Sequence, residues 1–530
     1  MLQDASSTNG SAARKPPSPY RLTPEQILLS EQRKAKTAEK ARLAAEKASV
    51  ESESNPDGLS LGRDAALATL GERGRIIGRR WIGVTPDSSH EEFGYKVKVM
   101  SWNLLAQALV RRELFPMSGN VLKTAAREPM IHREILERNA DIMCLQEVDR
   151  TDTLLPLLKS AGYAAHYSKG PGKKHGCLVA FRTSRFECAD THQILYDLQD
   201  IREPTTAFNR DGNVDSKGSS FKTTNIGALV KIRDVKNKER GFVLATTHLF
   251  WHPKYTYERA RQVSILLREI QRFRSAPAPG PQAQEGSENW VVLLAGDFNF
   301  IPLDATYSLL LSNPLTSSQS AALEHSRVVH KSVDPSAADL TPGASSEGND
   351  EDEEGGARAD DDEEQEGGEG EEQKEQDPDK VIKNARRARP EDGLASDEEL
   401  VRVFSENLRA LGGVEGKGVR SLCAEAHRAH RASDGGKGED ALRVFSDRLP
   451  VDEGRDGGWE HEWTCYTTYF KLVLDYIFLL PSPTTASTDE PRVLSILEPL
   501  KGEQMEPGLP QAGVCGSDHV AVGVELGWRS

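Results

Sequence analysis

The chain has 530 residues and a formal net charge of −15, with 67 Lys and Arg against 82 Asp and Glu. One tract, residues 347–380, holds 18 acidic and 3 basic side chains and so accounts for the whole imbalance. The remainder is close to neutral, so the overall charge neither favours nor excludes a polyanionic ligand. No apolar run has the length of a membrane span, no signal-peptide core follows Met1, and the six cysteines lack CxxC spacing. These features predict a soluble, intracellular protein, cytoplasmic or nuclear and not secreted, with reduced cysteines.

Composition along the chain predicts where folded and unfolded segments lie. The stretch that begins TPEQ carries an N-cap, a proline at the first helical position and a capping box, so a charged helix is expected there. The acidic tract has no aromatic or large aliphatic residue and cannot offset its ordering entropy. We therefore expect the following organisation: 1–20 disordered, 21–93 a charged helix and linker, 94–334 the first part of one folded domain, 335–397 an acidic disordered insertion, and 398–530 the second part of the domain.

Hydrophobic periodicity within the expected domain predicts strands mixed with helices. Runs typical of strands are 96–101, 142–147, 178–181, 225–232, 242–247, 290–295, 472–480 and 519–526. Runs typical of helices are 124–139, 154–161, 257–273, 306–311 and 398–411, whereas 412–460 is rich in Gly, Asp and Arg and is expected to be loop. This pattern favours the α/β class, with sheets covered by helices.

Polar side chains stand at or near one end of six of these expected strands. Each alone has an ordinary explanation as a turn cap or a satisfied buried group. Six together are harder to explain in that way, because buried carboxylates cost several kcal/mol unless they share a cation or hydrogen-bond donors. The residues are Asn103, Glu147, His248, Asp297 with Asn299, Asp475, and Asp518 with His519.

The candidate ligands are dominated by oxygen, which predicts a hard divalent cation. Glu147, Asp518 and Asn103, without any cysteine, favour Mg²⁺, with Mn²⁺ as a substitute, over zinc. No P-loop, covalent triad or nicotinamide-binding glycine fingerprint accompanies them. The natural chemistry is then metal-assisted attack of water on phosphorus. Asp297, supported by Asn299, would orient the water, and His519, positioned by Asp475, would stabilise charge on the phosphate.

The motifs SWN, LQEVD, THLFWHP, GDFN, LDYIF and SDH, in this order, resemble the endonuclease/exonuclease/phosphatase superfamily. The resemblance implies a DNase I-like four-layer α/β sandwich, in which two sheets are flanked by helices, and Mg²⁺-dependent enzymes. The stretches around these motifs look like the deadenylase and RNA exonuclease branch, similar to fungal Ngl-type exonucleases and their relatives nocturnin, Angel and the catabolite-repressor deadenylases. The resemblance also implies catalytic roles for the eight polar residues named above, including His248.

The same resemblance implies how a nucleotide is held. In that branch a phenylalanine and a proline stack on adenine, and the matching positions are Phe470 and Pro253. Phe470 has an ordinary alternative, core packing beside Tyr469. Independently of the resemblance, Lys174 flanks an expected strand, where ordinary surface charge is the favoured interpretation and contact with a backbone phosphate is the alternative. The same two interpretations apply to Arg182, Arg261 and Gln262.

The residues predict metal-assisted phosphoester hydrolysis, and the resemblance implies a Mg²⁺-dependent 3′–5′ RNA exonuclease that acts on a single-stranded 3′ end, with poly(A) as one candidate, and releases 5′-monophosphates. One alternative is a phosphatase or phosphodiesterase of the same fold acting on a nucleotide cofactor or lipid head group. The other is a non-catalytic RNA-binding scaffold, against which the occupied catalytic positions argue. The sequence does not identify a protein partner, and no membrane partner is expected.

Overall fold

The computed structural model describes residues 58–84, 92–202, 218–277, 290–336, 384–413, 419–433, 438, 441–482 and 490–529. Nearly all of them belong to one compact unit, Gly62–Ser530. The expected N-terminal charged helix and the core of the acidic insertion lie outside the described residues. In the part of the chain that is described, every helix is too short or too polar to cross a bilayer.

One seven-stranded sheet has the order β1-β16-β17-β2-β3-β5-β4. Its central strands β2 and β3 are parallel, and the other pairings in this sheet are antiparallel. The strands are β1 Trp81–Gly83, β2 Phe93–Asn103, β3 Ile142–Val148, β4 Tyr163–Ser168, β5 Gly176–Arg182, β16 Arg492–Leu497 and β17 Val522–Arg529.

A second sheet of six strands has the order β12-β15-β9-β8-β7-β6. Strands β8 and β9 are its parallel pair, and β15 runs antiparallel beside β9. The strands are β6 Phe186–Leu195, β7 Ile226–Asp234, β8 Gly241–His248, β9 Val291–Asp297, β12 Arg420–Ser421 and β15 Asp475–Leu479. Two two-stranded sheets complete the described strands: β10 Val328–His330 with β11 Ala385–Arg387, and β13 Cys465–Tyr466 with β14 Lys471–Leu472.

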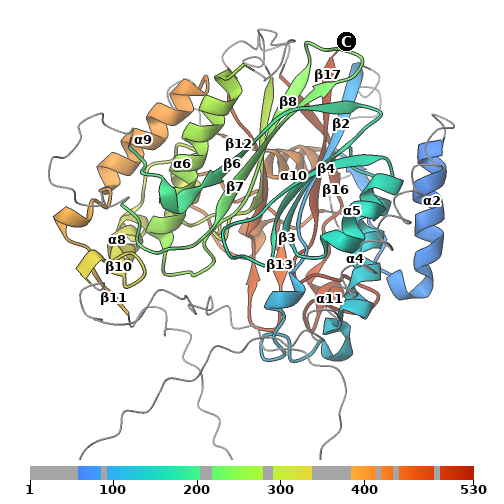
Figure 1. Cartoon of the computed structure of the whole chain (residues 1–530), viewed down its shortest axis with the longest axis horizontal. Coiled ribbons are helices and arrows are strands. Elements are labelled where there is room, and N and C mark those ends of the chain that lie inside the picture. Colours follow the sequence, from blue (N-terminus) through green and yellow to red (C-terminus); the bar gives the residue numbers. More distant parts are fainter. Residues whose placement is uncertain are drawn as a thin grey trace, which may run out of the picture. The chain divides into compact units, whose positions relative to one another are not determined.

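Helices cover the outer faces of the two sheets (Figure 1). One outer layer contains α4 Thr124–Arg138 and α5 Thr151–Ser160, and the other contains α6 Thr256–Ser275 and α9 Asp397–Ala410. The remaining helices are α2 Gly58–Leu70, α7 Ala305–Leu310, α8 Ser317–Ser326, α10 Leu422–Ala432 and α11 Gly502–Met505. Helix, sheet, sheet and helix make four layers, which confirms the predicted two-sheet α/β sandwich.

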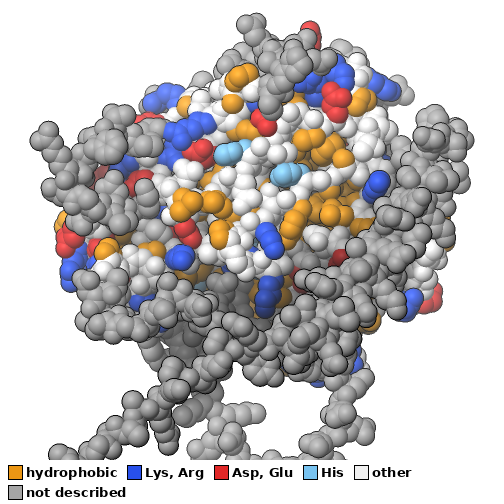
Figure 2. Space-filling view, in the orientation of Figure 1, with side chains coloured by type: hydrophobic (Ala, Val, Ile, Leu, Met, Phe, Trp, Pro, Cys, Tyr) orange, Lys and Arg blue, Asp and Glu red, His pale blue; other side chains and the backbone are white. Residues whose placement is uncertain are grey.

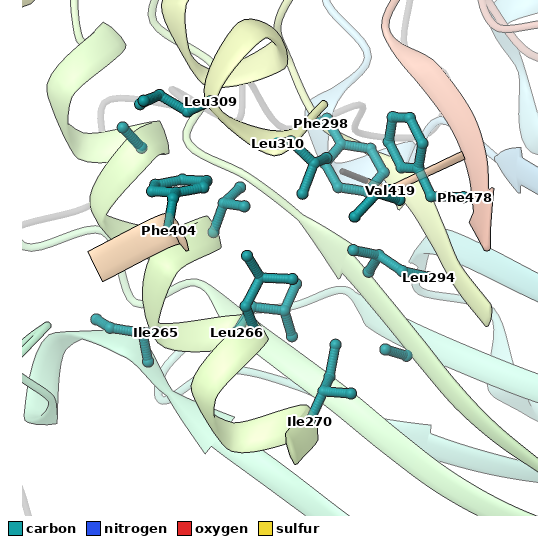
Figure 3. Packing of buried hydrophobic residues seen from close by; sticks show 14 of the residues in the cluster. Ile265, Leu266, Ile270, Leu294, Phe298, Leu309, Leu310, Phe404, Val419 and Phe478 are labelled. Carbon is teal, nitrogen blue, oxygen red and sulfur yellow. The ribbon is translucent and has the colours of Figure 1, made fainter. Parts of the chain in front are cut away.

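Strand alternation explains the layers, because successive side chains of a central strand enter different cores. In β9, Leu293 packs between the two sheets, whereas Leu294 packs under α6 and α9. Figure 3 shows Leu266 and Ile270 of α6 directed toward Leu294, with Phe478 of β15 beside them. Strands buried on both faces read as continuous apolar runs, which is why VVLLAGD was recognisable as a strand.

The predicted strands and helices are present with boundary shifts of a few residues, and three differences have physical causes. The expectation of loop throughout 412–460 is wrong, because α10 lies there and inserts Leu422, Cys423 and Ala426 between the sheets. Its Gly- and Asp-rich flanks concealed it. Residues before Gly94 also join the sheet, since β1 pairs with β16. In addition, β11 pairs with β10 within the range expected for the acidic insertion.

All six cysteines are free, and five of them are buried: Cys144, Cys177, Cys423, Cys465 and Cys515. Cys144 lies on β3 and Cys177 on β5, both within apolar strands. Cys188 on β6 is exposed.

Candidate active site

The predicted polar strand ends meet at one edge of the sandwich. The parallel pair β2 and β3 ends at Asn103 and Glu147, and the parallel pair β8 and β9 ends at His248 and Asp297, which are register partners. Because β15 runs antiparallel to β9, its first residue, Asp475, lies opposite Asp297. The topology thus gathers side chains from distant parts of the sequence, and from both sheets, at a single place.

Asn103 connects the two sheets. Its Nδ2 donates to Glu147 Oε1 at 2.8 Å and to Asp297 Oδ2 at 2.9 Å, and its Oδ1 accepts the Leu105 N–H at 2.9 Å. Asn103 and Asp297 are both 1 % exposed. One amide therefore holds two carboxylates at the same point, which is a costly arrangement unless a further positive group is shared between them.

Glu147 reaches this point through an irregularity in its strand. The register of β3 against β5 shifts between Leu145 and Val148, and Glu147 has φ +53°. Such a bulge re-aims a side chain, and a positive φ outside glycine stores backbone strain. The second oxygen, Oε2, accepts the Ala106 N–H at 2.8 Å, so the carboxylate is fixed in orientation.

Asp297 lies at the centre of the cluster. Its Oδ1 accepts the Asn299 N–H at 3.0 Å, and its Oδ2 lies 3.6 Å from His248 Nε2 and 3.7 Å from His519 Nε2. Asn299 also has a positive φ, +50°, and donates from Nδ2 to Leu249 O at 3.0 Å. The preceding Gly296 is required by packing, because a Cβ there would lie 2.2 Å from Thr247 O on β8.

His519 is held by a carboxylate on the opposite sheet. Its Nδ1 lies 2.7 Å from Asp475 Oδ2, and Thr464 Oγ1 accepts the Asp475 N–H at 3.1 Å. Burial opposes a charge on the imidazole, but the neighbouring charges of Asp475 and Asp297 outweigh it and raise the pKa of His519 well above its usual value. These neighbouring carboxylates therefore favour the imidazolium form of His519.

Asp518 precedes His519 and is only partly exposed. Ser517 Oγ donates to Asn103 O at 2.7 Å and to Asp518 Oδ1 at 3.3 Å, which ties this loop to the end of β2. Burial and the charge of Glu147 raise the pKa of Asp518, although His519 and Arg127 act in the other direction. A carboxylate in this setting gains from any additional positive charge nearby.

The cluster fits a divalent cation by its donor chemistry. Four carboxylates and two cationic side chains leave two formal negative charges uncompensated in a small volume: Glu147, Asp297, Asp475 and Asp518 against His519 and Arg127. Asp475 Oδ1 is buried without a hydrogen-bond partner. Oxygen-rich, negatively charged sites of this kind suit a hard dication. Among the described residues, ligand atoms fall within 4.8 Å of one another in two sets, Asp297, Asp475 and His519, and Cys465, Asp518 and His519.

The second of these sets includes a residue outside the predicted ligands. The sequence argument named no cysteine as a ligand, and Cys465 lies close to Asp518 and His519. The reason is pairing: Cys465 and His519 are partners in an isolated antiparallel bridge, although 54 positions separate them in the sequence. No local spacing could have indicated this contact.

The predicted nucleotide-binding residues lie at the surface. Phe470 is 54 % exposed and Tyr469 is 60 % exposed, so the alternative that Phe470 is a core residue is wrong. Both stand on a tight turn, in which Thr467 Oγ1 accepts the Phe470 N–H at 2.8 Å. Pro253 and Lys174 are exposed as well.

The remaining candidates for phosphate contact are buried or partly buried and already bonded within the protein. Arg261 is fully buried, pairs with Glu258 at 2.8 Å and donates to the Tyr196 carbonyl. Arg182 lies over the Tyr163 ring and beside Asp141. Gln262 donates to Thr223 and is also fully buried. A phosphate-binding role for Arg261 and Gln262 is therefore excluded by burial.

Sequence reasoning missed two side chains that border the cluster. Arg127 of α4 is buried, and it donates to Gly516 O at 2.7 Å, to Leu104 O at 2.7 Å and to Leu105 O. It thereby links the loop after Asn103 to the loop that carries Asp518. His175, next to Gly176 of β5, lies with its ring centroid 6.4 Å from that of His248. His175 precedes the expected strand 178–181, but a single histidine before a strand gives no signal of its own.

Charges on the visible face are mixed. Figure 2 shows Lys and Arg side chains interspersed with Asp and Glu, with exposed hydrophobic side chains between them. A mixed surface gives weaker long-range attraction for a polyanion than a continuous basic stripe would. Recognition of a nucleic acid would then depend on contacts close to the site.

A family model and several curated relatives match this chain. Residues 100–360 match the Endonuclease/Exonuclease/phosphatase family. A probable RNA exonuclease of Schizosaccharomyces pombe is 34 % identical over 234 residues, which is 44 % of this chain and 42 % of the relative. RNA exonuclease NGL2 of Saccharomyces cerevisiae is 34 % identical over 229 residues, 42 % of this chain and 43 % of that protein. The match thus spans less than half the length of these curated relatives.

Solved structures are similar at lower identity. The crystal structure of ANGEL2, a 2′,3′-cyclic phosphatase, in complex with adenosine-2′,3′-vanadate aligns with a TM-score of 0.47 and 16 % identity, covering 85 % of this chain and 99 % of that chain. The human nocturnin catalytic domain with bound sulfate aligns with a TM-score of 0.42 and 17 % identity, covering 84 % and 97 %.

Proposed function

Because this chain belongs to the endonuclease/exonuclease/phosphatase family, we propose that it is a Mg²⁺-dependent 3′–5′ RNA exonuclease. It removes nucleotides from a single-stranded 3′ end as 5′-monophosphates, with poly(A) as one candidate substrate. The observation that carries this proposal is the cluster in which Asn103 holds Glu147 and Asp297 together beside His519. The RNA exonuclease names of two relatives support RNA as the substrate.

Glu147, with Asp518 and the second lone pair of Asn103 Oδ1, would hold the cation. When bound, Mg²⁺ supplies a positive charge that polarises the phosphate and offsets charge in the transition state, and Mn²⁺ suits the same donors. The protein contributes fixed donors, since Ala106 N–H and Asn103 Nδ2 already orient the Glu147 carboxylate. Fixed orientation lowers the cost of assembling the site during the reaction.

Asp297 would bind the attacking water at Oδ2 and accept its proton. Its other oxygen is occupied by the Asn299 N–H, so one oxygen remains directed into the cluster. The Asn299 side chain is anchored to Leu249 O, which keeps its backbone in the strained conformation that presents this N–H. His248, 3.6 Å from the same Oδ2, would limit the positions that the water can occupy.

His519 would donate to a phosphate oxygen. Asp475 binds Nδ1 and keeps the ring protonated, and Nε2 is directed into the cluster, 3.7 Å from Asp297. A charged donor fixed before the reaction stabilises developing negative charge without reorganisation, an effect worth about 2.7–4 kcal/mol for a single donor.

The terminal base would stack on Phe470 and Pro253. Their exposure supports this, because a base can reach both side chains from solvent, and the Thr467 hydrogen bond holds Phe470 on its turn. Stacking contributes about 1–3 kcal/mol per base and tolerates any base, which suits an enzyme that trims strand ends. Lys174 would contact a backbone phosphate next to the terminal nucleotide.

The test uses the purified chain with Mg²⁺ on 5′- and 3′-labelled oligoadenylate, oligouridylate and a blunt duplex. The proposal expects a ladder from the 5′ label and immediate release of labelled mononucleotide from the 3′ label. Glu147→Gln should lower the rate at least 10³-fold without changing the thermal midpoint. Glu187→Gln, an exposed carboxylate paired with Lys238 at 2.8 Å, is the matched control and should retain the parent rate. Release of inorganic phosphate alone, or equal cleavage by Glu147→Gln, would refute the assignment.

A further inference from the structure

Cys465 and His519 are positioned against each other by backbone pairing. Beyond their bridge, the Tyr466 N–H donates to Asp518 O at 2.9 Å and the Val520 N–H donates to Thr464 O at 2.7 Å. These bonds fix the register on both sides, so the Cys465 and His519 side chains are cross-strand neighbours. The contact is part of the fold and does not depend on a flexible side chain.

Asp518 completes a set of three ligand types. One ligand atom each from Cys465, Asp518 and His519 lies within 4.8 Å of the other two. Around a tetrahedral zinc ion, with bonds of about 2.0–2.3 Å, ligand atoms lie roughly 3–4 Å apart. Cys465 and His519 are both 5 % exposed, whereas Asp518 is partly exposed and opens the set toward solvent. Small side-chain adjustments would close the set around an ion.

The surroundings match those of a zinc-binding histidine. A metal-binding imidazole usually donates its other ring N–H to a carboxylate, which fixes the tautomer and the ring orientation. Asp475 Oδ2 lies 2.7 Å from His519 Nδ1 and fills that position, so Nε2 is the nitrogen left to bind a metal. A thiolate also discriminates among metals, because sulfur prefers zinc and similar ions over Mg²⁺.

We propose that Cys465, Asp518 and His519 form a binding site for Zn²⁺ or a similar thiophilic dication, which shares Asp518 with the proposed Mg²⁺ site and differs from it in its thiolate and imidazole ligands. Binding displaces the thiol proton of Cys465 and the Nε2 proton of His519 to solvent, and both ligands then share their electron pairs with the metal. One thiolate and one carboxylate neutralise the charge of the ion. Because His519 Nε2 would be occupied, zinc would act as an inhibitor of the hydrolysis proposed above, and this consequence rests on that proposed function.

The binding test needs no turnover, so its result is independent of the exonuclease proposal. Co²⁺ is titrated into the purified chain, and a cobalt–thiolate charge-transfer band is followed in the near ultraviolet. The parent should show the band with saturation near one equivalent, and zinc should remove it. Cys465→Ala should lack the band, whereas Cys423→Ala, which removes a buried thiol from α10, should keep it. A band that is absent from the parent or retained in Cys465→Ala would overturn the site.

The inhibition arm compares zinc titrations at fixed Mg²⁺, with each variant normalised to its own zinc-free rate. Cys465→Ala should raise the half-inhibiting zinc concentration at least tenfold, while Cys423→Ala should match the parent. Equal zinc sensitivity in parent and Cys465→Ala would overturn the inhibitory role.

Discussion

Asp475→Asn tests whether His519 acts as a charged group. The substitution keeps the shape of the side chain but removes the carboxylate charge that lies 2.7 Å from His519 Nδ1. That charge is the main influence raising the pKa of His519 against the effect of burial, so the pKa should fall and the ring should be neutral at pH 7.5. Loss of one charged donor to the phosphate costs about 2.7–4 kcal/mol, which lowers kcat by about 10²- to 10³-fold.

The pH dependence gives the sharper result. A raised pKa means that the active, protonated ring is present at neutral pH and is lost only as pH rises through that pKa. Removing Asp475 moves this loss to lower pH, so the variant should regain part of its rate between pH 8 and pH 6 while the parent does not. Initial rates on 5′-labelled oligoadenylate at saturating Mg²⁺ measure this.

The control is Asp234→Asn, a buried carboxylate at the opposite end of the six-stranded sheet, where β7 ends. It should leave both the rate and the pH profile unchanged. If Asp475→Asn retained the parent kcat and pH profile while folding normally, His519 would not act as a charged donor.

Three further variants test separate parts of the structure. Phe470→Ala removes the exposed ring, and it should raise KM for oligoadenylate about 5- to 150-fold, from about 1–3 kcal/mol of stacking, with a smaller change in kcat. Arg127→Lys cannot reproduce the fork that binds three backbone carbonyls, so it should raise the Mg²⁺ concentration needed for half-maximal rate at least tenfold, measured by Mg²⁺ titration. His461→Gln tests stability: burial lowers the pKa of His461 to about 3, so the parent should lose about 1.4 kcal/mol per pH unit as pH falls from 6.5 toward 3. Urea unfolding at pH 7 and pH 5 should show a smaller loss in the variant.

The sequence predicted the strands that carry the site because their signals are local. VVLLAGDFN combines a run buried on both faces with polar residues where the strand ends, and these properties are visible without the fold. The same holds for Glu147 after IMCLQ. That these polar strand ends meet was predicted from the free-energy cost of burying isolated carboxylates. The structure brings Glu147, Asp297 and Asp475 together.

Residues whose role depends on long-range pairing were not predictable. Arg127 bonds to backbone carbonyls near positions 104 and 516, and a carbonyl carries no side-chain signature for sequence reasoning to detect. Cys465 contacts His519 only because an isolated bridge joins β13 to the segment that precedes β17. Helix α10 was missed for a related reason: its buried face fills a gap between two sheets, and that gap exists only in the folded molecule.

The division between predictable and unpredictable residues follows the physics of the site. The polar side chains of the cluster stand at or near strand ends, so they interrupt an apolar pattern and are visible in the sequence. Their supports act through hydrogen bonds to the backbone and through pairing register, which leave the pattern unchanged. The strained backbone is supported in the same way. Glu147 and Asn299 both have positive φ, and each is held by a hydrogen bond with a neighbouring segment. The Ala106 N–H donates to Glu147, and the Asn299 side chain donates to Leu249 O. A substitution that removes one of these supporting hydrogen bonds should therefore weaken catalysis even though no substrate-contacting residue has been replaced.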